Sequence, residues 1–123
     1  MTEILRSAGL QPEDIFIDPL VRPIGVDHKT GPVFLDSVEG IKRSLPGART
    51  IAGISNVSFG LPQRRLLNRT FLVLAMARGL DAAICDPLDA DIQSVLAASE
   101  ALLGQDLSLK RYLTYIRGHI KKT

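Results

Sequence analysis

The sequence has one cysteine, no tryptophan and few aromatic residues. A single cysteine, Cys85, can form neither an intramolecular disulfide nor a thiolate cage for a metal ion. It lies in an apolar run, which predicts a small buried side chain. The two histidines, His28 and His119, stand in polar or basic segments without a second ligand at metal-binding spacing. No metal site is therefore expected.

The sequence also lacks an excess of charge of one sign, since 15 basic residues oppose 13 acidic ones and the net charge is +2. Basic residues gather at Arg64 and Arg65 and again between Lys110 and Lys122, but aromatic side chains do not alternate with them. Nucleic-acid binding is not expected, because base stacking needs such aromatic side chains. The C-terminal cluster is typical of a solvated helix end.

No apolar run approaches the roughly 20 residues of a membrane span, and no signal peptide opens the chain. A cytoplasmic protein without membrane attachment is the resulting expectation. Glycine and proline are scattered, and no repeat at solenoid spacing is present. With 123 residues, 46% of them hydrophobic, the sequence predicts a single folded domain over residues 1–123.

Short apolar runs alternate with amphipathic segments along the chain. Three runs bounded by turn residues predict buried strands at Ile15–Ile17, Thr50–Ile54 and Asp81–Ile84. Helical spacing of apolar residues predicts helices over residues 33–45, 64–78, 92–103 and 109–120, and the end of another over residues 2–9. Asp89 or Asp91 is expected to cap the third of these helices.

This alternation argues for parallel strands joined by helical crossovers, hence an α/β protein. Periodicity leaves two folds open, a doubly wound open sheet and part of a barrel. A complete (β/α)8 barrel needs about 250 residues and eight strands. The 123 residues of this chain are too few for a whole one.

Polar residues follow each expected strand at its C-terminal end: Asp18, then Ser55 and Asn56, then Asp86. Functional groups gather at this edge in parallel α/β folds, so the pattern suggests a site. A structural alternative exists, because Asp before Pro is a common turn and Ser or Asn often caps one. Phosphate-binding glycine loops, dinucleotide fingerprints and nucleophile elbows are absent from the sequence.

Four segments are more specific: Ile17–Leu20, Gly53–Ser58, Leu67–Leu72 and Gly79–Ile84. With the ordered block GISNVSFGLPQRRLLNRTFL, they resemble the methyltetrahydrofolate:corrinoid methyltransferase family. That family includes the corrinoid/iron–sulfur protein methyltransferases and the folate domain of cobalamin-dependent methionine synthase. The resemblance extends from about residue 1 to residue 117. It implies the C-terminal part of a TIM (β/α)8 barrel, with about three parallel strands and crossover helices.

The resemblance implies methyl transfer between N5 of methyltetrahydrofolate and the cobalt of a corrinoid (cobalamin) on a partner protein. The positions that match the family's pterin pocket are Asp18, Gly53, Ser55, Asn56, Arg64 and Ile84. Asp18 would accept hydrogen bonds from the amino-pyrimidine edge of the pterin, which suits a fixed carboxylate. Asn56, the implied catalytic residue, would accept a hydrogen bond from protonated N5 without adding a charge. Arg64 would stack on a pterin face.

The family's site also uses an aspartate and an asparagine from N-terminal strands, which this chain does not match. The remaining strands could come from a separate polypeptide, identical chains could associate into a homodimer, or the chain could be a non-catalytic fragment that binds partners through its sheet edge. A dihydropteroate-synthase-like pterin enzyme is a further hypothesis, with Arg64 and Arg65 as its candidate phosphate-binding residues. The segment Ser55–Ser58 favours methyl transfer.

Overall fold

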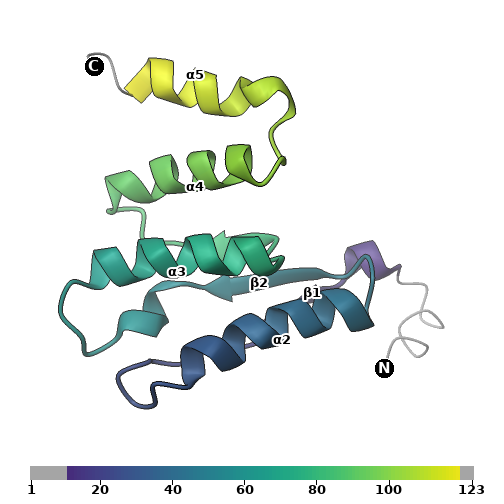
Figure 1. Cartoon of the computed structure of the whole chain (residues 1–123), viewed down its shortest axis with the longest axis vertical. Coiled ribbons are helices and arrows are strands. Elements are labelled where there is room, and N and C mark those ends of the chain that lie inside the picture. The colour runs from purple at the N-terminus through teal and green to yellow at the C-terminus, as the bar shows by residue number, and fades with distance from the viewer. Residues whose placement is uncertain (1–10, 120–123) are drawn as a thin grey trace. The chain divides into compact units, whose positions relative to one another are not determined.

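The computed structural model in Figure 1 describes residues 11–119. The helix end expected over residues 2–9 and the lysines at 121 and 122 lie outside these residues. The chain divides into two compact units, residues 1–85 and residues 86–123. The expectation of a single domain stays a prediction. Within residues 11–119, no helix is long and apolar enough to cross a membrane.

The first unit is built on a parallel sheet. Strands β1 (Phe16–Ile17), β2 (Arg49–Gly53) and β3 (Ala82–Ile84) lie in the order β1-β2-β3. Helix α2 (Thr30–Ser44) connects β1 to β2, and α3 (Arg64–Arg78) connects β2 to β3. The predicted α/β class with three parallel strands is confirmed. The arrangement is consistent with successive units of a (β/α) barrel.

The predicted helices match the observed ones closely. Helix α3 has the predicted bounds, whereas α2 begins at Thr30, ahead of the predicted start at Val33. The reason is that Pro32 lies in the first helical turn, where its missing N–H removes no intrahelical hydrogen bond. The residues that follow β2 form a 3-10 turn, η2 (Ser55–Ser58).

Helices α2 and α3 pack against each other beside the sheet (Figure 1). The rings of Phe34 and Phe71, one from each helix, have centroids 5.0 Å apart and an interplanar angle of 48°. Val38 of α2, Leu72 of α3 and Ala52 of β2 are all fully buried. Burial of this shared apolar layer is the main favourable contribution to folding of the unit.

The other face of the sheet is open. The side chains of Phe16 and Ile84 are 52% and 65% exposed. The register pairs Phe16 with Arg49 and Ile84 with Gly53, and paired residues project to the same side of a sheet. Arg49 lies over the Phe16 ring at 5.8 Å, in agreement with that placement. Parallel sheets are usually covered on both faces, whereas residues 11–119 leave this face largely uncovered.

The second unit contains helix α4 (Ala90–Leu102), which follows a short turn. Asp89 is its N-cap, and the Asp89 side chain accepts a hydrogen bond from the backbone nitrogen of Asp91 at 3.1 Å. The predicted cap at this helix is therefore confirmed. Cys85, at the boundary of the two units, is half-buried rather than buried. The prediction of a buried thiol was wrong because β3 already ends at Ile84.

Helix α5 (Lys110–His119) begins at a carboxylate cap. The two oxygens of Asp106 accept hydrogen bonds from the backbone nitrogens of Arg111 at 3.0 Å and of Tyr112 at 2.8 Å. Burial raises the pKa of Asp106, but these backbone bonds and the Arg111 guanidinium outweigh it and hold that pKa below its usual value. The cap thus favours the ionised carboxylate.

Asp81 joins three elements at the N-terminal end of the sheet. Its Oδ2 accepts hydrogen bonds from Lys42 Nζ at 2.7 Å and from the backbone nitrogen of Thr50 at 2.8 Å. Burial raises the pKa of Asp81, but the bonds from Lys42 and Thr50 together lower it below its ordinary value. The network links α2 and the starts of β2 and β3.

We expect Asp81→Asn to remove an acid-sensitive part of the stability. The folded-state pKa lies below the unfolded value of about 3.9, so the contribution is complete above the unfolded value and is lost as the pH falls through the folded-state pKa. At pH 7 the substitution should lower the free energy of unfolding by about 1–2 kcal/mol. The effect is no larger because the Asp81 side chain is about one-third exposed and solvent screens its interactions. Urea denaturation at several pH values measures this effect.

The matched control is Asp36→Asn, which removes a 75% exposed carboxylate that pairs with Arg78. It should change the free energy of unfolding by less than about 0.5 kcal/mol. An equal loss in both variants at pH 7 would contradict the role assigned to Asp81. So would an Asp81→Asn effect that persists undiminished in acid.

A pair of glycines gives a second test of the packing. Gly79 ends α3 with φ of 113°, and a Cβ built there would lie 2.9 Å from Lys42 Cγ. Gly79→Ala should therefore destabilise the chain by about 1–3 kcal/mol. Gly40→Ala, inside α2, meets no atom within 4 Å and should stabilise it by about 0.5–1 kcal/mol. Thermal unfolding measures both shifts, and two shifts of the same sign would contradict the close packing of Gly79 against Lys42.

Candidate functional site

The C-terminal ends of β1 and β2 carry three of the predicted site residues. Asp18 directly follows β1, and Ser55 and Asn56 open the turn η2 beyond β2. All three residues are exposed, and Ser55 lies on the same turn as Asn56. Because the strands are parallel, their ends meet at one edge of the sheet, where α/β proteins place their functional groups.

Two hydrogen bonds join the loop after Asp18 to the turn that carries Asn56. The side-chain Nδ2 of Asn56 donates to the backbone oxygen of Val21 at 2.7 Å. The backbone nitrogen of Ile24 donates to the backbone oxygen of Val57 at 3.0 Å. The structure therefore brings the two predicted segments together through a backbone carbonyl shortly after Asp18.

The bond to Val21 determines which end of the Asn56 amide is free. A carbonyl oxygen can only accept, so the amide nitrogen of Asn56 must face it. Oδ1 then points away from Val21 and receives no hydrogen bond from the described part of the chain. The exposed side chain is thereby set as a hydrogen-bond acceptor.

Asp18 is held by a turn of its own. Its Oδ1 accepts a hydrogen bond from the backbone nitrogen of Leu20 at 2.8 Å, and Leu20 has a φ of 68°. This is the Asp-Pro turn that the structural alternative predicts. The second oxygen, Oδ2, accepts no hydrogen bond from residues 11–119. The turn fixes the carboxylate and leaves most of its accepting capacity available.

Asp86, the polar residue after β3, forms the same kind of turn. Its Oδ1 accepts a hydrogen bond from the backbone nitrogen of Leu88 at 2.9 Å. It belongs to the second unit. The local bond agrees with the structural interpretation of this residue.

Gly53 and Ile84 lie at the strand ends beside these polar groups. They are register partners at the ends of β2 and β3, and the backbone nitrogen of Ile54 donates to the Ile84 oxygen at 3.1 Å. A Cβ built on Gly53 would meet nothing within 4 Å. A flat ring could therefore lie against the Gly53 backbone beside the exposed Ile84 side chain.

Arg64 is the first residue of α3, and its side chain contacts the turn η2. Its Nη2 donates to the Ser55 backbone oxygen at 2.8 Å, and its Nε donates to Ser58 Oγ at 3.0 Å. Its guanidinium carbon also lies 5.9 Å from the centre of the Phe59 ring. Stacking of Arg64 on a ligand stays a prediction. In this structure its planar group contacts the turn and the Phe59 ring.

Sequence reasoning missed Val21, Ser58 and Asn68. Ser58 is fully buried, and its hydroxyl donates to Asn68 Oδ1 at 2.7 Å. The one-turn spacing of Arg64 and Asn68 on a predicted helix was an available signal, because such residues face the same side. The Val21 carbonyl gave no signal, since a backbone acceptor is the same at every residue.

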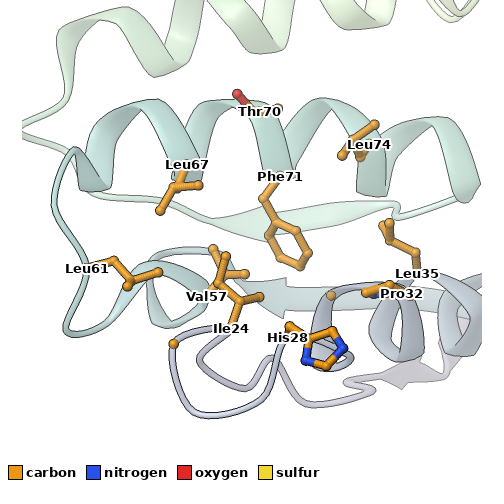
Figure 2. Close-up of a pocket in the computed structure, with 12 residues that line it drawn as sticks. Ile24, His28, Pro32, Leu35, Val57, Leu61, Leu67, Thr70, Phe71 and Leu74 are labelled. Carbon is orange, nitrogen blue, oxygen red and sulfur yellow. The ribbon is translucent and has the colours of Figure 1, made fainter.

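A separate groove of about 460 Å³ lies between α2 and α3 (Figure 2). Phe71 extends from α3 towards it, and Val57 and Leu61 line its other wall. Its polar side chains are His28 and Thr70, and His28 is exposed as predicted. An apolar wall does not match the polar edge of a pterin, so the strand ends suit that ligand better. No group of three or more His, Cys, Asp or Glu among residues 11–119 could hold a metal ion.

Comparison with known proteins identifies the class. Residues 1–86 match a family model described as pterin binding enzyme, so the chain belongs to that family. The resemblance noted in the sequence is thereby confirmed. Over 112 residues the chain is 37% identical to the methylcorrinoid:tetrahydrofolate methyltransferase of Eubacterium limosum, a match that covers 91% of the chain and 41% of the relative.

A second relative is the methionine synthase of Mycobacterium leprae (strain TN). It is 33% identical over 90 residues, which cover 68% of the chain and 8% of the relative. The chain therefore spans less than half the length of either of these relatives.

Proposed function

We propose that this chain contributes the C-terminal part of a site for methyl transfer between N5 of methyltetrahydrofolate and the cobalt of a corrinoid on a partner protein. The observation that carries the proposal is the Asn56 amide at the end of β2, held by Val21 with its oxygen free to accept. Membership of the pterin-binding family and the likeness to the Eubacterium limosum methyltransferase support it.

The residue types suit that chemistry. A tertiary N5 is a poor leaving group unless it is protonated, and the Asn56 oxygen would accept from N5–H⁺ without adding a charge. The Asp18 carboxylate would accept from the donors of the pterin's amino-pyrimidine edge. Gly53 and Ile84 would support the flat ring, and Ser55 would lie at its rim. The corrinoid, when its protein is bound, supplies the cobalt nucleophile.

The open sheet face supports a requirement for further strands. Phe16 and Ile84 are exposed on it, and the chain spans 41% of the Eubacterium limosum relative. An uncovered apolar face and a free strand edge favour association. We infer that the complete site needs barrel strands beyond the three described here, whatever their source. A homodimer that covers the same face, or a fragment without activity of its own, is the alternative.

The geometry around Arg64 disfavours a dihydropteroate-synthase-like reaction. Such an enzyme needs basic side chains directed at a pyrophosphate. Arg64 instead donates to the Ser55 carbonyl and to Ser58 Oγ. Using it for phosphate binding would break both bonds, so methyl transfer remains the preferred function.

The proposal predicts that the chain binds methyltetrahydrofolate through Asn56. Affinity measured by calorimetric titration should rise as the pH is lowered, because the amide oxygen stabilises protonated N5. Asn56→Ala should weaken binding by roughly tenfold and flatten this pH dependence. Asn56→Asp should also bind poorly, because it keeps an acceptor but loses the donor to Val21.

The decisive binding experiment uses a complete barrel. A chimera would join the N-terminal strands of the Eubacterium limosum relative to this chain. Binding by the chimera but not by the isolated chain would show that the added strands are required. A folded chimera that binds no folate would refute the proposal, and circular dichroism verifies folding.

Gly53→Val provides a prediction that separates binding from folding. A Cβ at this position meets no described atom within 4 Å, and valine favours strands, so the melting temperature should stay the same or rise slightly. The two methyl groups would occupy the space proposed for the pterin, and affinity should fall at least about tenfold. Unchanged affinity in a stable Gly53→Val variant would exclude the pterin from this surface.

A further inference from the structure

The turn that carries Asn56 is fastened to α3 by a buried hydroxyl group. Ser58 Oγ accepts a hydrogen bond from Arg64 Nε at 3.0 Å and donates to Asn68 Oδ1 at 2.7 Å. Ser58 is 0% exposed, so its hydroxyl is shielded from water, and its other acceptor within reach is the Ser55 backbone oxygen at a longer 3.1 Å. Arg64 and Asn68 lie one helical turn apart and reach it from the same side of α3.

Both ends of the turn are held by these contacts. The Ser55 backbone oxygen accepts from Arg64 Nη2 at 2.8 Å, while Ser58 is fixed through its side chain. Asn56 lies between these two points, and its own backbone oxygen accepts from the nitrogen of Phe59 at 3.2 Å. The backbone that presents the Asn56 amide therefore has little freedom to move.

We propose that Ser58 and Asn68 are positioning residues for Asn56, an inference that rests on the proposed function. The Asn56 side chain is exposed, and one neutral hydrogen bond to Val21 favours a single orientation by only about tenfold. A functional group held by one such bond needs a rigid backbone beneath it. The Ser58 hydroxyl, fixed by Arg64 and Asn68, supplies that rigidity without touching the ligand.

Backbone strain at the start of α3 agrees with this role. Gln63, the residue before Arg64, has φ of 58° and no side-chain cap. L residues rarely adopt this conformation, and it persists only where surrounding contacts enforce it. The bonds from Arg64 and Asn68 to the turn are contacts of that kind.

Nuclear magnetic resonance on the 15N-labelled chain tests the inference without requiring activity. Asn68→Leu removes the acceptor, Asn68→Asp keeps it, and Thr70→Ala is the control because its hydroxyl bonds to Leu66 within α3. In Asn68→Leu we expect the backbone amides of the turn to exchange roughly tenfold faster, and the Asn56 side-chain amide signals to shift. Asn68→Asp and Thr70→Ala should retain the wild-type pattern.

Ser58→Ala should reproduce the Asn68→Leu pattern while the amides of α2 keep their exchange rates. Methyltetrahydrofolate titrations of the same proteins should show roughly tenfold weaker binding for Asn68→Leu, restored in Asn68→Asp. Unchanged Asn56 signals in Asn68→Leu would overturn the inference, and so would shifted signals with unchanged folate affinity. If the wild-type chain binds no folate, the isolated chain is not a pterin half-site, and the amide signals still decide whether Ser58 and Asn68 hold Asn56.

Discussion

The hydrogen bond from the Asn56 amide to the carbonyl oxygen of Val21 connects the two strand ends that make up the candidate site. Because the acceptor belongs to the backbone, the bond holds the β1 loop in place and also determines which amide atom faces outwards. The bond between Ile24 and Val57 prevents the two loops from separating. The positions of Asp18 and Asn56 depend on this connection between loops that are distant in the sequence.

The two ends of the sheet differ in role: one stabilises the fold and the other carries the candidate site. At the N-terminal end, Asp81 Oδ2 accepts from both Lys42 and Thr50 and so joins α2 to the sheet. At the C-terminal end, Asp18 and Asn56 each keep acceptor atoms that no residue between 11 and 119 uses. Acceptors that face solvent contribute little to stability, so this edge can carry chemistry while the opposite edge stabilises the fold.

Local patterns in the sequence predicted most of the fold. The bounds of α3 follow from apolar spacing and from Gly79, whose positive φ suits only glycine. The parallel direction of the strands and the location of Asn56 at a strand end follow from the alternation of strands and helices. The acceptor at Val21 could not be predicted, because a backbone carbonyl leaves no pattern in the sequence, and the burial of Ser58 depends on its packing against α3. Cys85 was misjudged because an apolar neighbourhood in sequence does not guarantee burial beyond a strand end.

The open face of the sheet contains two uncovered regions, one at Phe16 and one at Gly53. Phe16 lies beside Arg49 at the N-terminal end of β2, and its side chain is 52% exposed, as expected where further barrel strands would pack. Gly53 lies at the C-terminal end of β2, where neither its backbone conformation nor any described neighbour requires glycine. The open space above this glycine leaves room for a ligand close to the backbone, as the proposed pterin site requires. The exposure of Phe16 is therefore expected of an uncovered sheet face, whereas the open space at Gly53 is where the proposed function places the flat pterin ring.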